Sequence, residues 1–208
     1  MKTTLTTIDS AFTSQYRGLL ETQRNIKQQL ETYTFDLSTT EITDAVVERM
    51  LAFWYFNVNN NKEILGREIN TTSADFFTES CLLFLKSYYE QKEGFKVLSE
   101  RNITNGNKIR PDISIWKNSQ LVAVIELKVS DGWKGKMMSY HLKERQEQIS
   151  ALAPDAFFGV LAFWNFFDIK AEDWNTKHFG LLYFDKGNNH QRTDASIEKL
   201  ILEINKHI

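Results

Sequence analysis

The sequence predicts an α/β protein built around a mixed sheet of about five strands. Stretches with apolar residues at helical spacing alternate with short apolar runs of strand length. The segment 109–128 has two apolar halves around a short polar turn, which is typical of a β-hairpin. The run 157–163 is apolar throughout, as in a strand buried on both faces. With 42% apolar and 13% aromatic residues, the 208-residue chain can bury a sizeable core.

Two helices are expected before any strand. Apolar residues at helical spacing predict the first over residues 8–32, and Ser38 with Glu41 fits a capping box at the start of the second. We therefore expect residues 1–70 to form an N-terminal helical extension that packs on the core or on a second subunit. Residues 71–208 are expected to form the core.

The core elements are expected in the order helix, strand, hairpin, helix, strand, strand, helix. A start signal precedes the first core helix, and Gly94 is expected to end it. The expected ranges are a helix at 74–92, a strand at 95–103, the hairpin at 109–128, a helix from 138 to near 154, strands at 157–163 and 179–184, and a helix from 194.

The composition excludes several classes of protein. A net charge of −2 argues against a surface coated in positive charge, although it leaves room for a local basic cleft. Cys81 is the only cysteine, which excludes a disulfide within the chain and argues against a cysteine-based metal site. The N-terminus lacks the apolar segment of a signal peptide, and no apolar run reaches about 18 residues. The expected location is the cytoplasm.

The predicted hairpin contains three charged residues, Asp112, Glu126 and Lys128. Glu126 and Lys128 end an otherwise apolar run, and burying an unpaired charge is costly. If the hairpin closes symmetrically about Ser119, with a loop of odd length, Asp112 lies directly opposite Glu126, with Cβ atoms about 4.5–5.5 Å apart. A loop of even length would turn the two carboxylates to opposite faces of the sheet.

A hard cation would remove the repulsion between two ionised carboxylates at that distance. Oxygen ligands suit Mg²⁺ or Mn²⁺, so we expect Asp112 and Glu126 to bind one of these ions, with the backbone carbonyl of Leu127 as a further ligand. Lys128 shares a face with Glu126, where its ammonium can lower the pKa of an attacking water or stabilise a pentavalent phosphate. This set of groups suits phosphodiester hydrolysis. A plain cross-strand salt-bridge cluster is the alternative.

Pro111-Asp112, followed after thirteen residues by Glu126-Leu127-Lys128, resembles the motif of the PD-(D/E)XK nuclease superfamily. The predicted flanking elements match as well, and the resemblance covers roughly residues 74–185. It implies a restriction-endonuclease-like α/β/α sandwich with an N-terminal helical addition. It also implies that Asp112 and Glu126 are metal ligands and that Lys128 is the catalytic lysine.

Many members of the superfamily add a glutamate from the first core helix. Glu79 is the candidate for this further catalytic and metal-binding residue, with Glu68 in the preceding loop as the fallback. A solvated glutamate is the other interpretation of Glu79. Some members also carry Gln followed four residues later by Tyr on the helix after the motif. Here Leu152 follows Gln148, so only Gln148 matches, and we expect it to position substrate or water.

Five basic residues follow the motif closely, namely Lys134, Lys136, His141, Lys143 and Arg145. We expect them to contact the phosphates of a substrate, although a solvated helix face is an equal interpretation for each. The sequence as a whole favours a Mg²⁺-dependent nuclease, most simply an endonuclease acting on DNA in host defence, restriction or repair. The near-neutral charge leaves room for a homodimer, a partner subunit or RNA as the substrate. The alternative is a non-catalytic member of the fold, or an interaction module that dimerises through its N-terminal helices.

Overall fold

The computed structural model describes residues 4–66, 73–104, 109–129, 136–164, 179–183 and 192–208. The chain divides into two compact units, residues 1–35 and residues 36–208. The described part of the first unit contains one helix, α1 (Leu5–Leu30), which is close to the predicted helix over 8–32. Thr4 caps it, because the Thr4 hydroxyl accepts a hydrogen bond from the backbone N–H of Thr7.

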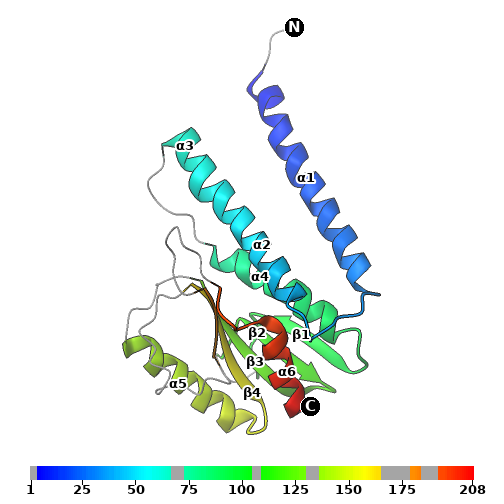
Figure 1. The fold of residues 1–208 in the computed structure, drawn as a ribbon, viewed down its shortest axis with the longest axis vertical. Coiled ribbons are helices and arrows are strands. Elements are labelled where there is room, and N and C mark those ends of the chain that lie inside the picture. Colours follow the sequence, from blue (N-terminus) through cyan, green and yellow to red (C-terminus); the bar gives the residue numbers. More distant parts are fainter. Residues whose placement is uncertain (1–3, 67–72, 105–108, 130–135, 165–178, 184–191) are drawn as a thin grey trace. The chain divides into compact units, whose positions relative to one another are not determined.

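The second unit is an α/β structure, which confirms the predicted α/β class (Figure 1). A π-helical segment, η1, joins its first two helices, so the chain stays helical through the polar run 57–62. The elements are α2 (Glu41–Trp54), η1 (Tyr55–Asn60), α3 (Asn61–Leu65), α4 (Ala74–Tyr89), β1 (Phe95–Ser99), β2 (Ile113–Lys117), β3 (Gln120–Lys128), α5 (Lys136–Leu152), β4 (Phe157–Trp164), β5 (Phe179–Tyr183), α6 (Ile197–Ile204) and a final 3₁₀ turn (Asn205–His207).

The strands form a mixed sheet in the order β1-β2-β3-β4-β5. β1, β2 and β3 are antiparallel neighbours, whereas β3, β4 and β5 run parallel. The outer backbone groups of Val97, in the edge strand β1, bond to one side chain of α4 and to that of its C-cap residue, Glu90. Lys86 Nζ donates to the Val97 carbonyl at 3.2 Å, and the Val97 N–H donates to Glu90 Oε1 at 3.0 Å. These bonds protect the edge from pairing with another strand.

Helices cover both faces of the sheet, and the alternation of side chains along β4 separates the two faces. Phe158, Val160 and Ala162 form a core cluster with Leu142 and Ile149 of α5. The intervening residues of β4 face the other helices. The ring of Phe163 contacts Phe77 of α4 at a centroid distance of 5.5 Å, and a Cβ at Gly159 would lie 3.2 Å from Leu200 of α6.

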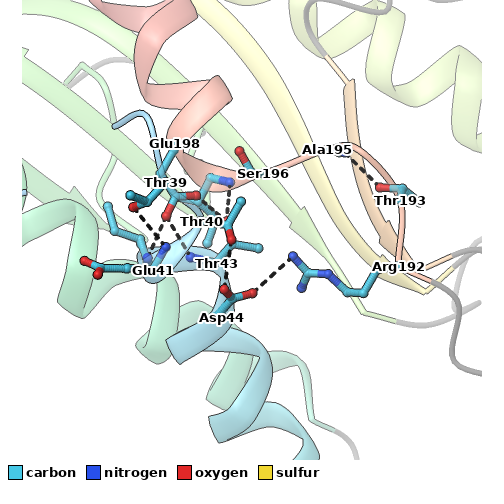
Figure 2. Close-up of polar contacts among 12 residues, drawn as sticks. Thr39, Thr40, Glu41, Thr43, Asp44, Arg192, Thr193, Ala195, Ser196 and Glu198 are labelled. Carbon is cyan, nitrogen blue, oxygen red and sulfur yellow. Dashed lines mark hydrogen bonds and ion pairs between the residues drawn. The ribbon is translucent and has the colours of Figure 1, made fainter. Parts of the chain in front are cut away.

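α2 and α6 cap each other at their first turns (Figure 2). The buried carboxylate of Glu198 accepts hydrogen bonds from the backbone N–H of Ile42 at 2.6 Å and of Thr43 at 3.2 Å. The Thr43 hydroxyl donates to the same carboxylate and accepts from the N–H of Ile197 at 2.8 Å. An anion at a helix start satisfies N–H groups that have no partner within the helix and interacts favourably with the helix dipole. This cap ties α2 to α6.

The predicted boundary near residue 70 differs from the observed division after Phe35. α2 packs within the second unit because it buries an apolar face there, including Val46 and Met50, and shares the cap with α6. The expected capping box is wrong, since the hydroxyl and the N–H of Ser38 both bond to Asp36 and the helix starts later, at Glu41. That residues 1–35 pack on the core or on a second subunit stays a prediction.

Candidate functional site

The hairpin closes with a two-residue turn and a β-bulge. Lys117 pairs with Gln120, and the two residues between them have positive φ angles, 49° at Asn118 and 67° at Ser119, as a type I′ turn requires. The predicted odd loop is therefore wrong. On its own, this even loop would turn Asp112 and Glu126 to opposite faces. The bulge prevents this, because Val122 has no partner in β2 and shifts the register by one residue.

Beyond the bulge, the register is centred on Ser119, as predicted. Ile115 pairs with Ala123, and Ile113 pairs with Ile125. Asp112 directly precedes Ile113, and Glu126 directly follows Ile125, so the next pair of the ladder would place Asp112 opposite Glu126. The bulge therefore produces the opposition that we expected an odd loop to produce.

The three predicted residues come together at this end of the hairpin. Lys128 Nζ lies 3.3 Å from Glu126 Oε2 and 3.4 Å from Asp112 Oδ2, so one ammonium bridges both carboxylates. Asp112 Oδ2 also accepts a hydrogen bond of 2.7 Å from the backbone N–H of Leu127. That bond fixes the Asp112 side chain against β3. The role of the Leu127 carbonyl as a further metal ligand stays a prediction.

Glu126 is the most buried of the three, with 8% of its side chain exposed, against 18% for Lys128 and 28% for Asp112. Burial raises the pKa of Glu126 above its ordinary value, and the nearby charge of Asp112 raises it further. The positive charges of Lys128 and Arg145 oppose this shift. The protein therefore holds a carboxylate where the charged form is disfavoured, which is common at sites that bind a cation or move a proton.

α5 forms the other wall of the site. Arg145 Nε lies 3.4 Å from Glu126 Oε1, which is close enough for an ion pair, but this buried oxygen accepts no hydrogen bond from any described residue. Between α5 and the strand end is a cavity of about 200 Å³. Its lining residues are Glu126, Lys128, His141, Leu142, Glu144, Arg145 and Gln148. The volume exceeds the roughly 30 Å³ that one water occupies in the liquid.

These donor groups fit a hard divalent cation. Two carboxylates and a backbone carbonyl are all oxygen donors, which Mg²⁺ and Mn²⁺ prefer. The buried Glu126 Oε1, with an acceptor position unused among the described residues, suits such a ligand. No third acidic, histidine or cysteine side chain in the described part of the chain joins Asp112 and Glu126. Mg²⁺ commonly completes its coordination with water and substrate phosphate, so two carboxylates suffice.

The other predicted residues divide into three groups. Gln148 and Arg145 line the cavity with Glu126, as a substrate-binding role requires. Glu79 is exposed on α4, which packs on the face of the sheet opposite α5. Among the described residues it does not join Asp112 and Glu126, and its role as a ligand stays a prediction. Lys134 and Glu68 are outside the described residues, and of Lys136 only its place as the first residue of α5 is described.

Two more residues of α5 line the cavity: His141, one of the basic residues expected to contact phosphates, and Glu144, which was not predicted to be part of the site. His141 Nδ1 lies 3.8 Å from Glu144 Oε2, and both side chains line the cavity. Helical spacing also favours His141, because residues 141, 145 and 148 are spaced i, i+4, i+7 and so share one face of a helix. Once Arg145 and Gln148 are assigned to the site, this spacing adds His141.

The chain matches no family model, no curated protein and no solved structure. The likeness to the PD-(D/E)XK superfamily therefore stays a prediction based on the motif and its hairpin. None of the helices in the described ranges is both long and apolar enough to cross a membrane.

Proposed function

We propose that the protein is a Mg²⁺-dependent nuclease, most simply an endonuclease acting on DNA, on a restriction-endonuclease-like α/β/α sandwich. This proposal rests on one observation: the ammonium of Lys128 contacts the carboxylates of both Asp112 and Glu126, beside a cavity that Arg145 lines. A fold needs no pair of carboxylates so close together, one of them deeply buried, for stability alone. The arrangement suits a site that binds a cation and a phosphate.

Asp112 and Glu126 would hold the cation, together with the carbonyl of Leu127. When bound, Mg²⁺ supplies Lewis-acid stabilisation of charge on the phosphate and favours ionisation of an attacking water. The chain's own residues would orient the metal ligands and stabilise the negative charge that grows on the phosphate. The N–H of Leu127 fixes Asp112 through a bond of 2.7 Å. Lys128 would turn its ammonium toward the non-bridging oxygens of the phosphate as their negative charge grows.

Arg145 and Gln148 would bind the substrate from the α5 side. A guanidinium can bind phosphate oxygens in two places at once, and an amide can donate to a phosphate or a water. With a net charge of −2, the chain cannot attract nucleic acid through overall charge, so local basic residues must provide the contact. Binding should weaken as salt rises, because phosphate contacts release counterions.

A cleavage assay tests the proposal. Supercoiled plasmid, linear duplex, single-stranded DNA and RNA are incubated with the protein in Mg²⁺, Mn²⁺ or chelator. We expect cleavage of at least one substrate that chelator abolishes and that Lys128→Ala lowers about 100-fold or more. Lys96→Ala, which removes an exposed lysine from β1, should retain activity. Cleavage that survives both chelator and Lys128→Ala would contradict the mechanism.

The bridged carboxylates also fit a second candidate, a non-catalytic interaction module whose ion cluster only holds β2 and β3 together. Lys128 and Arg145 already place positive charge beside both carboxylates without any metal. If no DNA or RNA is cleaved, and titration calorimetry with Mg²⁺ and with Mn²⁺ shows no binding, this second function replaces the first.

A further inference from the structure

α1 carries a side-chain pattern that its role as a simple surface helix does not explain. From Phe12 onward, six positions follow each other at alternating intervals of four and three residues, and we call them the α1 seam. They are Phe12, Tyr16, Leu19, Gln23, Ile26 and Leu30. This spacing repeats every seven residues, which is the a/d pattern of a coiled coil. A helix packed on a globular core needs only a broader stripe with a period of 3.6.

The α1 seam exposes large side chains. The exposed fractions are 55% for Phe12, 57% for Tyr16 and 62% for Leu19. In its described part, the first unit contains no second helix or strand that could cover them. Since most helical stability in proteins comes from packing an apolar face, a helix of 26 residues with this stripe calls for a helical partner.

We propose that α1 pairs with α1 of a second copy of this chain, forming a parallel two-stranded coiled coil along the α1 seam. A second copy necessarily carries the same seven-residue period. Pairing with a second copy also brings no like charges together at the e and g positions that flank the seam. These positions hold one charged residue, Lys27, which faces Thr22 of the other copy. The flanking positions are Thr13, Gln15, Leu20, Thr22, Lys27 and Gln29.

Gln23 decides the orientation. It is the one polar residue of the seam between Phe12 and Leu30. In a parallel, in-register pair the two Gln23 side chains meet and can bond to each other, as single polar residues at a positions do. In an antiparallel pair, Gln23 would face Leu19 or Ile26 and lose that bond. The apolar surface also suffices, since burying the exposed parts of the seam on both copies removes on the order of 1,000 Å² from water, which a specific interface needs.

Analytical ultracentrifugation of the full chain tests the proposal without reference to nuclease activity. At micromolar concentration, we expect a species of twice the 24.3 kDa chain mass. Leu19→Glu with Ile26→Glu should give a monomer, because it places charge in the seam. Ser14→Glu with Gln28→Glu adds the same charge at outward f positions and should leave the dimer intact. Circular dichroism of both double variants checks that the α/β unit remains folded.

Cross-linking tests the orientation. In a parallel pair, Leu19→Cys lies opposite its copy and should form a covalent dimer under mild oxidation. The natural Cys81 does not interfere, because it is fully buried. The proposal is overturned if the wild-type chain sediments as a monomer, if Leu19→Glu with Ile26→Glu stays dimeric, or if Leu19→Cys gives no covalent dimer.

Discussion

Lys128→Met tests whether the two carboxylates depend on a shared cation. Methionine keeps most of the volume of the lysine stem but removes the ammonium that bridges Asp112 and Glu126. Without added metal, the two carboxylates then face each other across the strand end with no ammonium between them. We expect the fold to lose stability, and we expect Mg²⁺ to restore it by taking the place of the lost charge.

The expected loss lies between two measured classes of ion pair. Breaking a fully buried pair costs about 3–5 kcal/mol, whereas an exposed pair contributes less than about 1 kcal/mol. Lys128 is 18% exposed, and its two contacts of 3.3 and 3.4 Å are longer than strong hydrogen bonds. An intermediate cost of about 2 kcal/mol follows. In a chain of this size, that loss corresponds to a fall of about 4–8 °C in melting temperature.

Thermal unfolding of the wild type, Lys128→Met and the surface control Lys96→Met provides the assay, each with chelator and with a Mg²⁺ titration. A ligand present at 100 times its dissociation constant stabilises the folded state by about 2.7 kcal/mol, so Mg²⁺ should recover the loss in Lys128→Met. An unchanged melting temperature for Lys128→Met in chelator would refute the ion-pair reasoning. If added Mg²⁺ leaves the melting temperature of Lys128→Met unchanged, cation binding by the carboxylates is refuted.

Three further changes probe the same structure. Glu126→Gln should stabilise the metal-free protein at neutral pH, because the raised pKa of Glu126 means that the folded state disfavours its charged form. The stability difference from the wild type should disappear below pH 4.5, where the wild-type carboxyl is protonated as well. Calorimetry should also show that the variant no longer binds Mg²⁺. Glu198→Ala leaves the N–H groups of Ile42 and Thr43 without their acceptor and should cost about 3–5 kcal/mol in urea unfolding, whereas Glu198→Gln should cost less, and equal costs would contradict the capping role. Ser119→Gly relieves a positive φ in the type I′ turn and should raise stability by about 1 kcal/mol, which thermal unfolding would show as a higher melting temperature.

The hairpin shows how far the sequence could predict the site. The alternation of apolar residues predicted both strands, and the spacing of Asp112 and Glu126 predicted the register that opposes them. The loop length and the bulge that produce this register were not predictable, since the same register can arise from an odd loop or from an even loop with a bulge. Val122 gives no sign of being unpaired, because a bulged valine reads like any other strand residue.

Contacts between segments that are far apart in the sequence also could not be predicted. The pair of Ser38 and Glu41 fits a local capping signal, but Asp36 bonds to Ser38 instead, and the cap of α2 comes from Glu198. Likewise, nothing local to Arg145 indicates that it lies beside Glu126, because the pairing depends on how α5 packs on the sheet. Periodicity determines which face of a helix is apolar, and the tertiary fold determines which charges that face brings together.

The mutual cap of α2 and α6 has a consequence for the order of synthesis. The bond from the Ile42 N–H to Glu198 joins residues 156 positions apart. At about 5–20 residues per second, the ribosome makes the acceptor roughly 8–30 s after the donor. Until then, the first turn of α2 has donors without their final partner, and Val46 and Met50 lack the completed core. A chain truncated before Glu198 would keep α2 in that state and expose it to chaperones and proteases.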